Sequence, residues 1–279
     1  MAHGPYECVL EVGPARIYVG DSVTYFTDLA ADDVIVCGSH GGDTAALFGA
    51  ACGAKAVILN DAGGGKDGAG FSGLAAVEQY GIAAATVSYL SARIGSGTDT
   101  WESGLISRCN RWAAEAGVST DLSAADAARL LAAWPARTGT DRPATPADRP
   151  PRLVSAGPSR VIVLDSASMV DDSCIGAIVV TGSHGGATGG RAVRAAVAAA
   201  FFNDAGGGKD DAGISRLPLL DRDGIPGGTA GCETTWIGDG WDTYESGVLS
   251  HVNDTAARLG LAAGMAVRDA VAILAQVTV

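Results

Sequence analysis

Lysine and histidine are rare in this 279-residue chain, and most of them lie in two short strings that each occur twice. Asn-Asp-Ala-Gly-Gly-Gly-Lys-Asp holds two of the three lysines, at residues 60–67 and again at 203–210. Gly-Ser-His-Gly-Gly, at 38–42 and 182–186, holds two of the four histidines. Reactive side chains placed twice in glycine-rich frames indicate an enzyme that acts on a polar small molecule.

The histidine string follows a short apolar run that we predict to be a strand, so it forms a loop at a strand end. Its glycines would let backbone N–H groups approach a ligand closely, as in an anion or oxyanion site. The alternative is a tight turn whose histidine bonds only to a neighbouring loop. We expect the loop glycines to contact substrate: Gly41, Gly42, Gly185 and Gly186. The serines are expected to be nucleophiles or donors and the histidines acids or bases: Ser39, Ser183, His40 and His184.

The lysine string is not a phosphate-binding P-loop, because aspartate follows the lysine where that motif has serine or threonine. Its lysine could activate a serine, hold a substrate carboxylate or form a Schiff base. An internal salt bridge is the structural alternative. We expect catalytic roles for the charged residues of both copies: Asp61, Lys66, Asp67, Asp204, Lys209 and Asp210. We expect substrate contacts from Asn60 and Asn203.

A third pair of segments differs between the halves, since Ser91-Ala92-Arg93-Ile94-Gly95 becomes Thr234-Thr235-Trp236-Ile237-Gly238. A guanidinium suits a carboxylate, whereas an indole offers an apolar or stacking wall. The exchange predicts one composite site, or one live and one decayed site. Further expected substrate contacts are Ser91, Arg93, Glu233 and Thr234. Asp99-Thr100 and Asp242-Thr243 stand just before predicted helices, where N-capping and complementation of the helix dipole are the simplest interpretation.

The recurring strings belong to a longer internal match at a constant spacing of 143 to 144 residues. We therefore predict a tandem duplication, with repeats at 13–132 and 157–275 joined by a linker at 133–156. Five of the ten prolines lie in that linker, which favours an extended chain. We expect the two halves to face each other about a pseudo-twofold axis.

Short, continuous apolar runs within each repeat predict strands covered on both faces. The predicted strands are 16–19, 34–37, 56–59 and 83–87 in the first repeat, and 161–163, 177–181, 198–202 and 226–230 in the second. The predicted helices include 44–52, 74–79, 104–116 and 191–199. This alternation indicates a Rossmann-like α/β unit with mainly parallel sheets, and ligands of such sheets bind at the carboxyl ends of the strands.

Composition narrows the class of protein. A formal charge of −12 argues against nucleic acid or an anionic membrane surface as a partner. The six cysteines are scattered, which argues against a disulfide framework or a zinc cluster. The start of the chain shows no signal-peptide pattern, so we expect a cytoplasmic protein, and its size and composition favour a homo-oligomer.

The leading hypothesis is a hydrolase of an amide, imide or ester bond that needs no cofactor. Serine would be nucleophile or oxyanion donor, lysine the base and histidine the proton shuttle. One alternative is an isomerase or lyase that works by Lys/Asp/His proton transfer, or through a divalent metal held by His40, Asp61 and Asp67. The other is a two-lobed module that binds an anionic metabolite without turnover.

Overall fold

The computed structural model describes residues 6–135, 141–147, 149–156, 159–188 and 192–277. Contacts within the chain divide it into two compact units. Unit 1 comprises Met1–Gly63, Gly68–Ala147 and Gly208–Asp210, and unit 2 comprises Gly64–Asp67, Asp148–Gly207 and Asp211–Val279. Each unit thus includes a short segment, 208–210 or 64–67, that the sequence assigns to the other predicted repeat.

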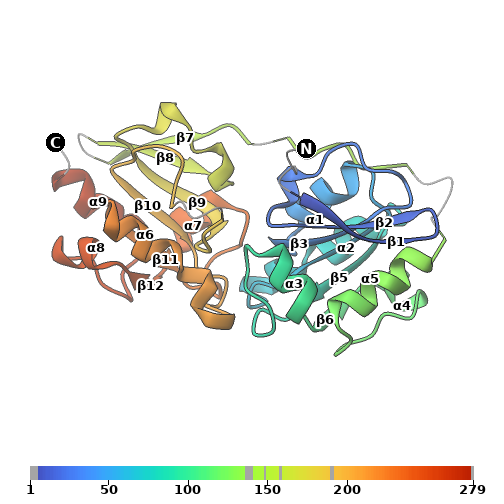
Figure 1. Ribbon diagram of the computed structural model, residues 1–279. Helices are drawn as coiled ribbons and strands as arrows, with labels where there is room; N and C mark the ends of the chain where they lie inside the picture. The colour runs from blue at the N-terminus through green and yellow to red at the C-terminus, as the bar shows by residue number, and fades with distance from the viewer. Residues whose placement is uncertain (1–5, 136–140, 148, 157–158, 189–191, 278–279) are drawn as a thin grey trace. The chain divides into compact units, whose positions relative to one another are not determined.

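Unit 1 contains a six-stranded mixed sheet whose strands follow one another in sequence order (Figure 1). The four inner strands are parallel, and the two edge strands pair antiparallel with their neighbours. The strands are β1 (Tyr6–Val12), β2 (Ala15–Gly20), β3 (Val34–His40), β4 (Ala56–Asn60), β5 (Ala83–Val87) and β6 (Ile106–Cys109). The helices are α1 (Asp43–Ala51), α2 (Gly73–Glu78), α3 (Gly97–Ser103), α4 (Arg111–Glu115) and α5 (Ala124–Ala133), with 3-10 turns η1 (Val23–Tyr25) and η2 (Lys66–Phe71).

Unit 2 contains a second six-stranded sheet with the same sequential order and the same pattern of parallel and antiparallel pairs (Figure 1). Its strands are β7 (Arg152–Ala156), β8 (Ser159–Leu164), β9 (Ile178–His184), β10 (Ala199–Asn203), β11 (Gly227–Ala230) and β12 (Leu249–Val252). Its helices are α6 (Arg216–Arg222), α7 (Gly240–Ser246), α8 (Asp254–Arg258) and α9 (Val267–Val277), with 3-10 turns η3 (Ala167–Met169), η4 (Asp172–Cys174) and η5 (Lys209–Ile214).

The α/β class with mostly parallel sheets is therefore confirmed. The finer Rossmann-like relation is not, because neither sheet shows the reversal of strand order that marks a doubly wound topology.

Both faces of each sheet are covered, as the continuous apolar runs predicted. In unit 1, Val34 and Val36 of β3 pack toward α5, whereas Ile35 and Cys37 pack toward α1. The helix α5 shows the matching pattern, with Ala124, Ala127, Ala128 and Leu131 buried along one face. In unit 2, α9 covers one face of the sheet and α6 the other. These two layers bury the inner strands, and the ends of those strands carry the candidate site.

All eight predicted strands are present, but the edge strands β1, β6, β7 and β12 were not predicted. The strands β1, β6 and β12 include exposed residues, so they lack the continuous apolar runs that marked the inner strands. The edge strands also extend beyond the predicted repeats. Strand β1 precedes the first predicted repeat, and β7 lies inside the predicted linker.

Two helix predictions were wrong. The segment 104–116 is not one helix but contains strand β6 followed by helix α4. Gly104 is the C-cap of α3, and the Asn110 side chain caps the N-terminus of α4. Gly104 has no room for a side chain, since a Cβ would lie 2.4 Å from the carbonyl oxygen of Thr100. The segment 191–199 has no helix over 192–198, and Ala199 begins β10; Arg191 lies outside the described residues.

No helix in the described part of the chain is long and apolar enough to cross a membrane.

Candidate active site

The two recurring strings lie where the sequence placed them, at the carboxyl ends of parallel strands. The histidine string ends β3 in unit 1 and β9 in unit 2, and each lysine string starts at the end of the next strand, β4 or β10. In the parallel pairing, His40 is opposite Asn60 and His184 is opposite Asn203. The predicted loops therefore start side by side on the edge where ligands of parallel sheets bind.

The histidine loop is closed by its own hydrogen bonds. Gly41 N donates to the carbonyl oxygen of Asn60 at 2.7 Å, and Gly185 N donates to that of Asn203 at the same distance. The next glycine N–H in each loop donates to the preceding imidazole. A Cβ on Gly41 would lie 2.5 Å from Thr86 Cγ2, so glycine is required here for close packing. These N–H groups are already paired, so the loop does not present the open oxyanion cradle that its composition suggested.

The imidazole of His40 is held in one tautomer. Its Nδ1 accepts the Gly42 N–H at 3.1 Å, so the neutral ring carries its proton on Nε2. Burial lowers the pKa of His40 to about 4, and the ring is therefore neutral at pH 7. His184 accepts the Gly186 N–H in the same way, also at 3.1 Å. In this state Nε2 of His40 carries the proton and can act as a donor, so the ring suits an electrophilic role better than that of a base.

The serines beside these histidines support a backbone turn. Ser39 Oγ accepts the Val23 N–H, and Ser183 Oγ accepts the Ala167 N–H, each at 2.9 Å. Within the described ranges, no hydrogen bond or ion pair joins Ser39 or His40 to a lysine. The described contacts of Ser39 and His40 thus do not join them to a lysine.

Asn60 and Asn203 are fully buried and hold the first turn of each lysine loop. Asn60 Oδ1 accepts the Ala62 N–H at 2.9 Å, while its Nδ2 donates to the carbonyl oxygen of Ala92 at 3.0 Å. Asn203 makes the same pair of contacts, with Ala205 N at 2.7 Å and Thr235 O at 3.5 Å. Both are structural clamps in this arrangement, and neither side chain is open to a ligand.

The aspartates that follow them anchor the segment after the next strand. Asp61 Oδ1 accepts the Tyr89 N–H at 2.8 Å, and Asp204 Oδ1 accepts the Cys232 N–H at 2.9 Å. Burial raises the pKa of Asp61, although hydrogen bonds from Tyr89 N and the Ser107 side chain act in the opposite direction. A buried carboxyl with a raised pKa at a strand edge is a candidate proton acceptor.

The glycines of the lysine string serve an unusual backbone path. Four consecutive residues, 62–65, have positive φ angles between 49° and 76°, and residues 205–208 repeat this with φ between 51° and 75°. Left-handed backbone is unfavourable for residues with a Cβ, which explains why three of the four are glycine. The path carries each lysine to a position where its backbone N–H is also bonded, Lys66 N to Cys232 O at 2.9 Å and Lys209 N to Tyr89 O at 2.8 Å.

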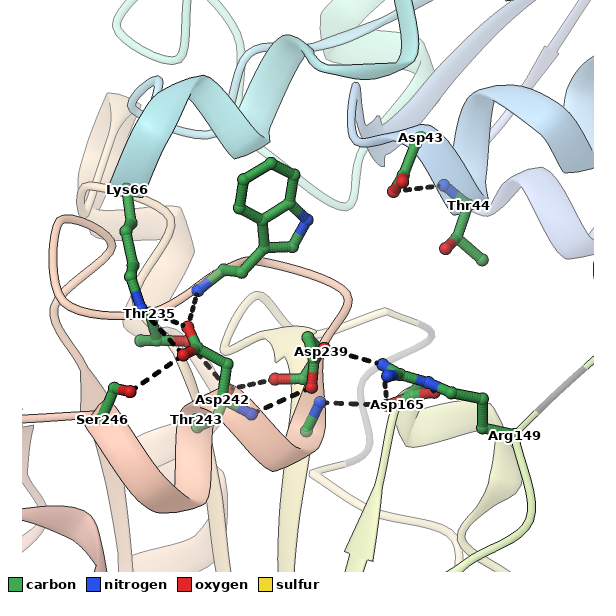
Figure 2. A network of polar contacts seen from close by, with 12 residues as sticks. Asp43, Thr44, Lys66, Arg149, Asp165, Thr235, Asp239, Asp242, Thr243 and Ser246 are labelled. Atoms are coloured by element: carbon green, nitrogen blue, oxygen red, sulfur yellow. Dashed lines mark hydrogen bonds and ion pairs between the residues drawn. The ribbon is translucent and has the colours of Figure 1, made fainter. Parts of the chain in front are cut away.

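Each lysine ammonium is held by an aspartate of the unit to which the loop segment belongs. In unit 2, Lys66 Nζ donates to both carboxylate oxygens of Asp242, at 2.8 and 3.0 Å (Figure 2). In unit 1, Lys209 Nζ donates to both oxygens of Asp99, at 2.8 and 3.1 Å. The lysine side chains remain 33% and 25% exposed, so a ligand could still reach the ammonium groups.

Asp99 and Asp242 were predicted to cap a helix and to complement its dipole; the capping part is wrong, whereas their place in the first turn fits the dipole part. The caps are Ser96 and Asp239, and each predicted cap lies in the first turn, three residues further on. Burial alone would raise the pKa of Asp99, but hydrogen bonds from Lys209 Nζ and Arg93 N outweigh it and lower the pKa. Burial would also raise the pKa of Asp242, but hydrogen bonds from Lys66 Nζ and Trp236 N outweigh it and lower the pKa. The sequence did carry a signal, since both aspartates recur at the repeat spacing.

The start of α7 is held by a salt bridge from the predicted linker. Arg149 Nη2 lies 2.8 Å from Asp165 Oδ1 and 2.9 Å from Asp239 Oδ2 (Figure 2). Asp239 Oδ1 in turn accepts the Asp242 N–H at 2.9 Å. Arg149 thus stabilises the turn that positions the aspartate of Lys66. Sequence reasoning missed Arg149, because it lies in the linker and has no repeated counterpart.

The remaining predicted site residues either hold a turn or are exposed. Ser91 and Thr234 tie a turn, accepting the Leu105 and Val248 N–H groups at 2.9 and 3.1 Å. Arg93 is half exposed and donates from Nε to Asp210 Oδ2 at 2.8 Å. The remaining charged residues, Glu233 and Asp67, are exposed.

Among the residues that the structure describes, no group of three or more His, Cys, Asp or Glu side chains is arranged to hold a metal ion. The structure therefore gives no support to the alternative metal site.

What the site can do chemically follows from these contacts. Each unit fixes a lysine ammonium on an aspartate in the first turn of a helix. In unit 1 the strand ends also carry a neutral His40 and the buried Asp61 carboxyl. A fixed ammonium stabilises negative charge that develops on a substrate oxygen. Comparison with known proteins adds no further assignment: no protein-family model, no curated protein and no solved structure matches this chain.

Proposed function

We propose that the protein is a small-molecule enzyme that hydrolyses an amide, imide or ester bond without a metal, with a reaction centre in each unit. One observation carries the proposal. Both units hold a lysine ammonium on a carboxylate in the first turn of a helix, and both use a left-handed glycine loop to bring it there. Hydrolysis of an acyl bond passes through an oxyanion, which a preorganised cation stabilises.

The contacts change the role proposed for each residue. Lysine is the oxyanion-stabilising cation in the resting geometry, because an ammonium that donates to a carboxylate is not free to accept a proton. A base role for Lys66 or Lys209 would require the ion pair to open. Ser39 and Ser183 remain the proposed nucleophiles, and the Nε2–H of His40 is a proposed donor to the substrate carbonyl. Asp61 follows β4 where His40 of β3 pairs with Asn60, so it lies on the strand end next to that of Ser39, and it is the proposed acceptor of the nucleophile's proton.

The proposal extends to the history and assembly of the chain. We propose that the two units descend from a tandem duplication, because equivalent contacts recur at the repeat spacing with nearly equal lengths. A pseudo-twofold arrangement, a relation to Rossmann-type sheets, a homo-oligomeric state and a cytoplasmic location are further proposals. Size-exclusion chromatography with light scattering tests the oligomeric state.

The experiment is a hydrolysis screen over linear amides, cyclic imides, lactams and esters with the wild-type protein. Variants Lys66→Met and Lys209→Met, singly and together, are then assayed on any substrate that turns over. Loss of an oxyanion-stabilising group typically lowers kcat by about 10²–10³-fold. We expect a loss of that size in at least one single variant, and Lys→Arg should recover part of it because the charge is kept.

The outcome that contradicts the proposal is full activity in both single variants and in the double variant, with circular dichroism unchanged. Absence of turnover for every class in the screen also counts against it. Tight binding of a substrate analogue without any conversion would favour the two-lobed binding module instead.

A further inference from the structure

The backbone around position 93 in unit 1 matches that around position 236 in unit 2, so the side chain is the main difference. Arg93 N donates to Asp99 Oδ2 at 2.7 Å, and Trp236 N donates to Asp242 Oδ2 at 2.6 Å. Two residues later, a glycine N–H in each unit donates to the glycine of the histidine string at 2.7 Å. Matching backbone hydrogen bonds with different side chains indicate two sites that share a mechanism and differ in the ligand that they bind.

In unit 1, two cations meet at one carboxylate oxygen. Asp99 Oδ1 lies 2.8 Å from Lys209 Nζ and 3.8 Å from Arg93 Nη2. In unit 2, the corresponding oxygen, Asp242 Oδ1, accepts from Lys66 Nζ and from the Ser246 hydroxyl, both neighbours shown in Figure 2. Arg93 therefore gives Asp99 a second cation in unit 1, and Trp236, at the corresponding position of unit 2, carries no charge.

The second contact of Arg93 is of a kind that a ligand can replace. Its Nε donates to Asp210 at 2.8 Å, but the two side chains are 49% and 63% exposed. Ion pairs this exposed contribute little to stability, because water and salt screen them. A guanidinium binds a carboxylate best through two parallel N–H donors, whereas Asp210 is bonded through one. A ligand carboxylate that uses both donors would compete well with Asp210.

We propose that the site in unit 1 binds substrates that carry a carboxylate, which takes the place of Asp210 on the Arg93 guanidinium. Lys209 then lies within reach of the group to be hydrolysed. Unit 2, with Trp236 in the same position, does not select for a carboxylate. This inference rests on the proposed function in that it names the substrate class of one of its two sites.

The test is a binding titration with two probes, N-acetylglycine and N-acetylglycinamide, which differ only in carboxylate against carboxamide. Ligand-observed NMR on the full chain gives the dissociation constants without any need for turnover. We expect the wild type to prefer N-acetylglycine by at least about fivefold, as a charged bidentate contact provides. Arg93→Gln should remove the preference. Asp210→Asn should strengthen N-acetylglycine binding by about two- to fivefold, because it removes the competing carboxylate.

A matched control is Arg129→Gln, also in unit 1. Arg129 is 50% exposed and bonds to Asp126 at 2.8 Å, so it reproduces the exposure and ion pairing of Arg93 at another place. The control should keep the preference for N-acetylglycine. Equal binding of the two probes by the wild type, no binding of either, or an unchanged preference in Arg93→Gln would each overturn the inference.

The result is separable from that of the proposed function. A carboxylate preference that depends on Arg93, together with no turnover in the hydrolysis screen, would leave this inference standing and remove the enzymatic proposal. Turnover that depends on Lys209, with no effect of Arg93→Gln on binding, would do the reverse.

Discussion

The tie between Lys209 and Asp99 should be measurable as a coupling free energy. The perturbation is a double-mutant cycle with Lys209→Met, Asp99→Asn and the double variant, because the cycle isolates the pairwise interaction from other effects of each change. The methionine keeps the length of the side chain. The asparagine keeps an acceptor for the Arg93 N–H, which Asp99 Oδ2 now accepts at 2.7 Å.

The expected magnitude follows from exposure and geometry. Fully exposed ion pairs contribute about 0.2–1 kcal/mol, and hydrogen bonds to charged groups in protected positions about 1.5–3 kcal/mol. The Lys209 and Asp99 side chains are 25% and 10% exposed and make two contacts near 3 Å, which places the pair between these limits. We expect a coupling of about 1–2 kcal/mol.

The assay is urea unfolding followed by circular dichroism, with midpoint and slope compared across the four proteins. A second cycle on Arg129 and Asp126, exposed by 50% and 60%, gives the reference for a surface pair and should show the smaller coupling. A coupling for Lys209 and Asp99 that does not exceed the reference would refute the reasoning. It would mean that the ammonium is not held, and the proposed site would lose its central feature.

Two further predictions concern the loops. Gly207 and Gly208 both have left-handed φ angles, +72° and +73°. They differ in the space around them, because a Cβ on Gly207 would meet nothing nearer than 3.9 Å, whereas a Cβ on Gly208 would lie 2.9 Å from Tyr89 O. Urea unfolding should therefore show Gly207→Ala costing about 1–2 kcal/mol and Gly208→Ala clearly more, and equal costs would contradict the loop geometry. Burial lowers the pKa of His40 from 6.5 to about 4, so as the pH falls the unfolded chain binds the proton before the folded chain does. The folded state therefore has a stability contribution of about 1–3 kcal/mol above pH 6.5, and this contribution is lost as the pH falls from 6.5 to 4. His40→Gln should flatten that part of the stability profile, and an unchanged slope would count against a buried neutral imidazole.

The inner sheet was predictable from the sequence because burial on both faces leaves a pattern in the residues themselves. Val34 to Cys37 and Ala56 to Leu59 are wholly apolar, and no other local structure explains runs of that length so well. The edge strand β6 gave no such run. Its segment, with Leu105, Cys109 and Trp112 at helical spacing, fitted a helix, and pairing with β5 overrode that local preference.

The site was predictable in its members but only partly in their roles. Glycine, histidine and lysine at strand ends identified the loops, since those residue types are rare elsewhere in the chain. The role of Asp99 depends on Lys209, which is 110 residues away, and no local pattern records a contact of that range. The tautomer of His40 depends on a single backbone N–H two residues on, which composition does not reveal.

The strained backbone path of the lysine loop is nearly offset by the contacts that it makes. An alanine in left-handed backbone costs about 1–2 kcal/mol, and each of three glycines about 0.5–1 kcal/mol in chain entropy, so the path over residues 62–65 costs about 2.5–5 kcal/mol. The Lys66–Asp242 pair, one third exposed at the lysine, returns about 1–2 kcal/mol. The hydrogen bonds of Ala62 N to Asn60 Oδ1 and of Lys66 N to Cys232 O add about 0.5–1.5 kcal/mol each, so the contacts nearly offset the cost of the path. The chain builds this path twice and leaves the lysine side chains 33% and 25% exposed, so each copy keeps a cation that solvent can reach, as the proposed function requires.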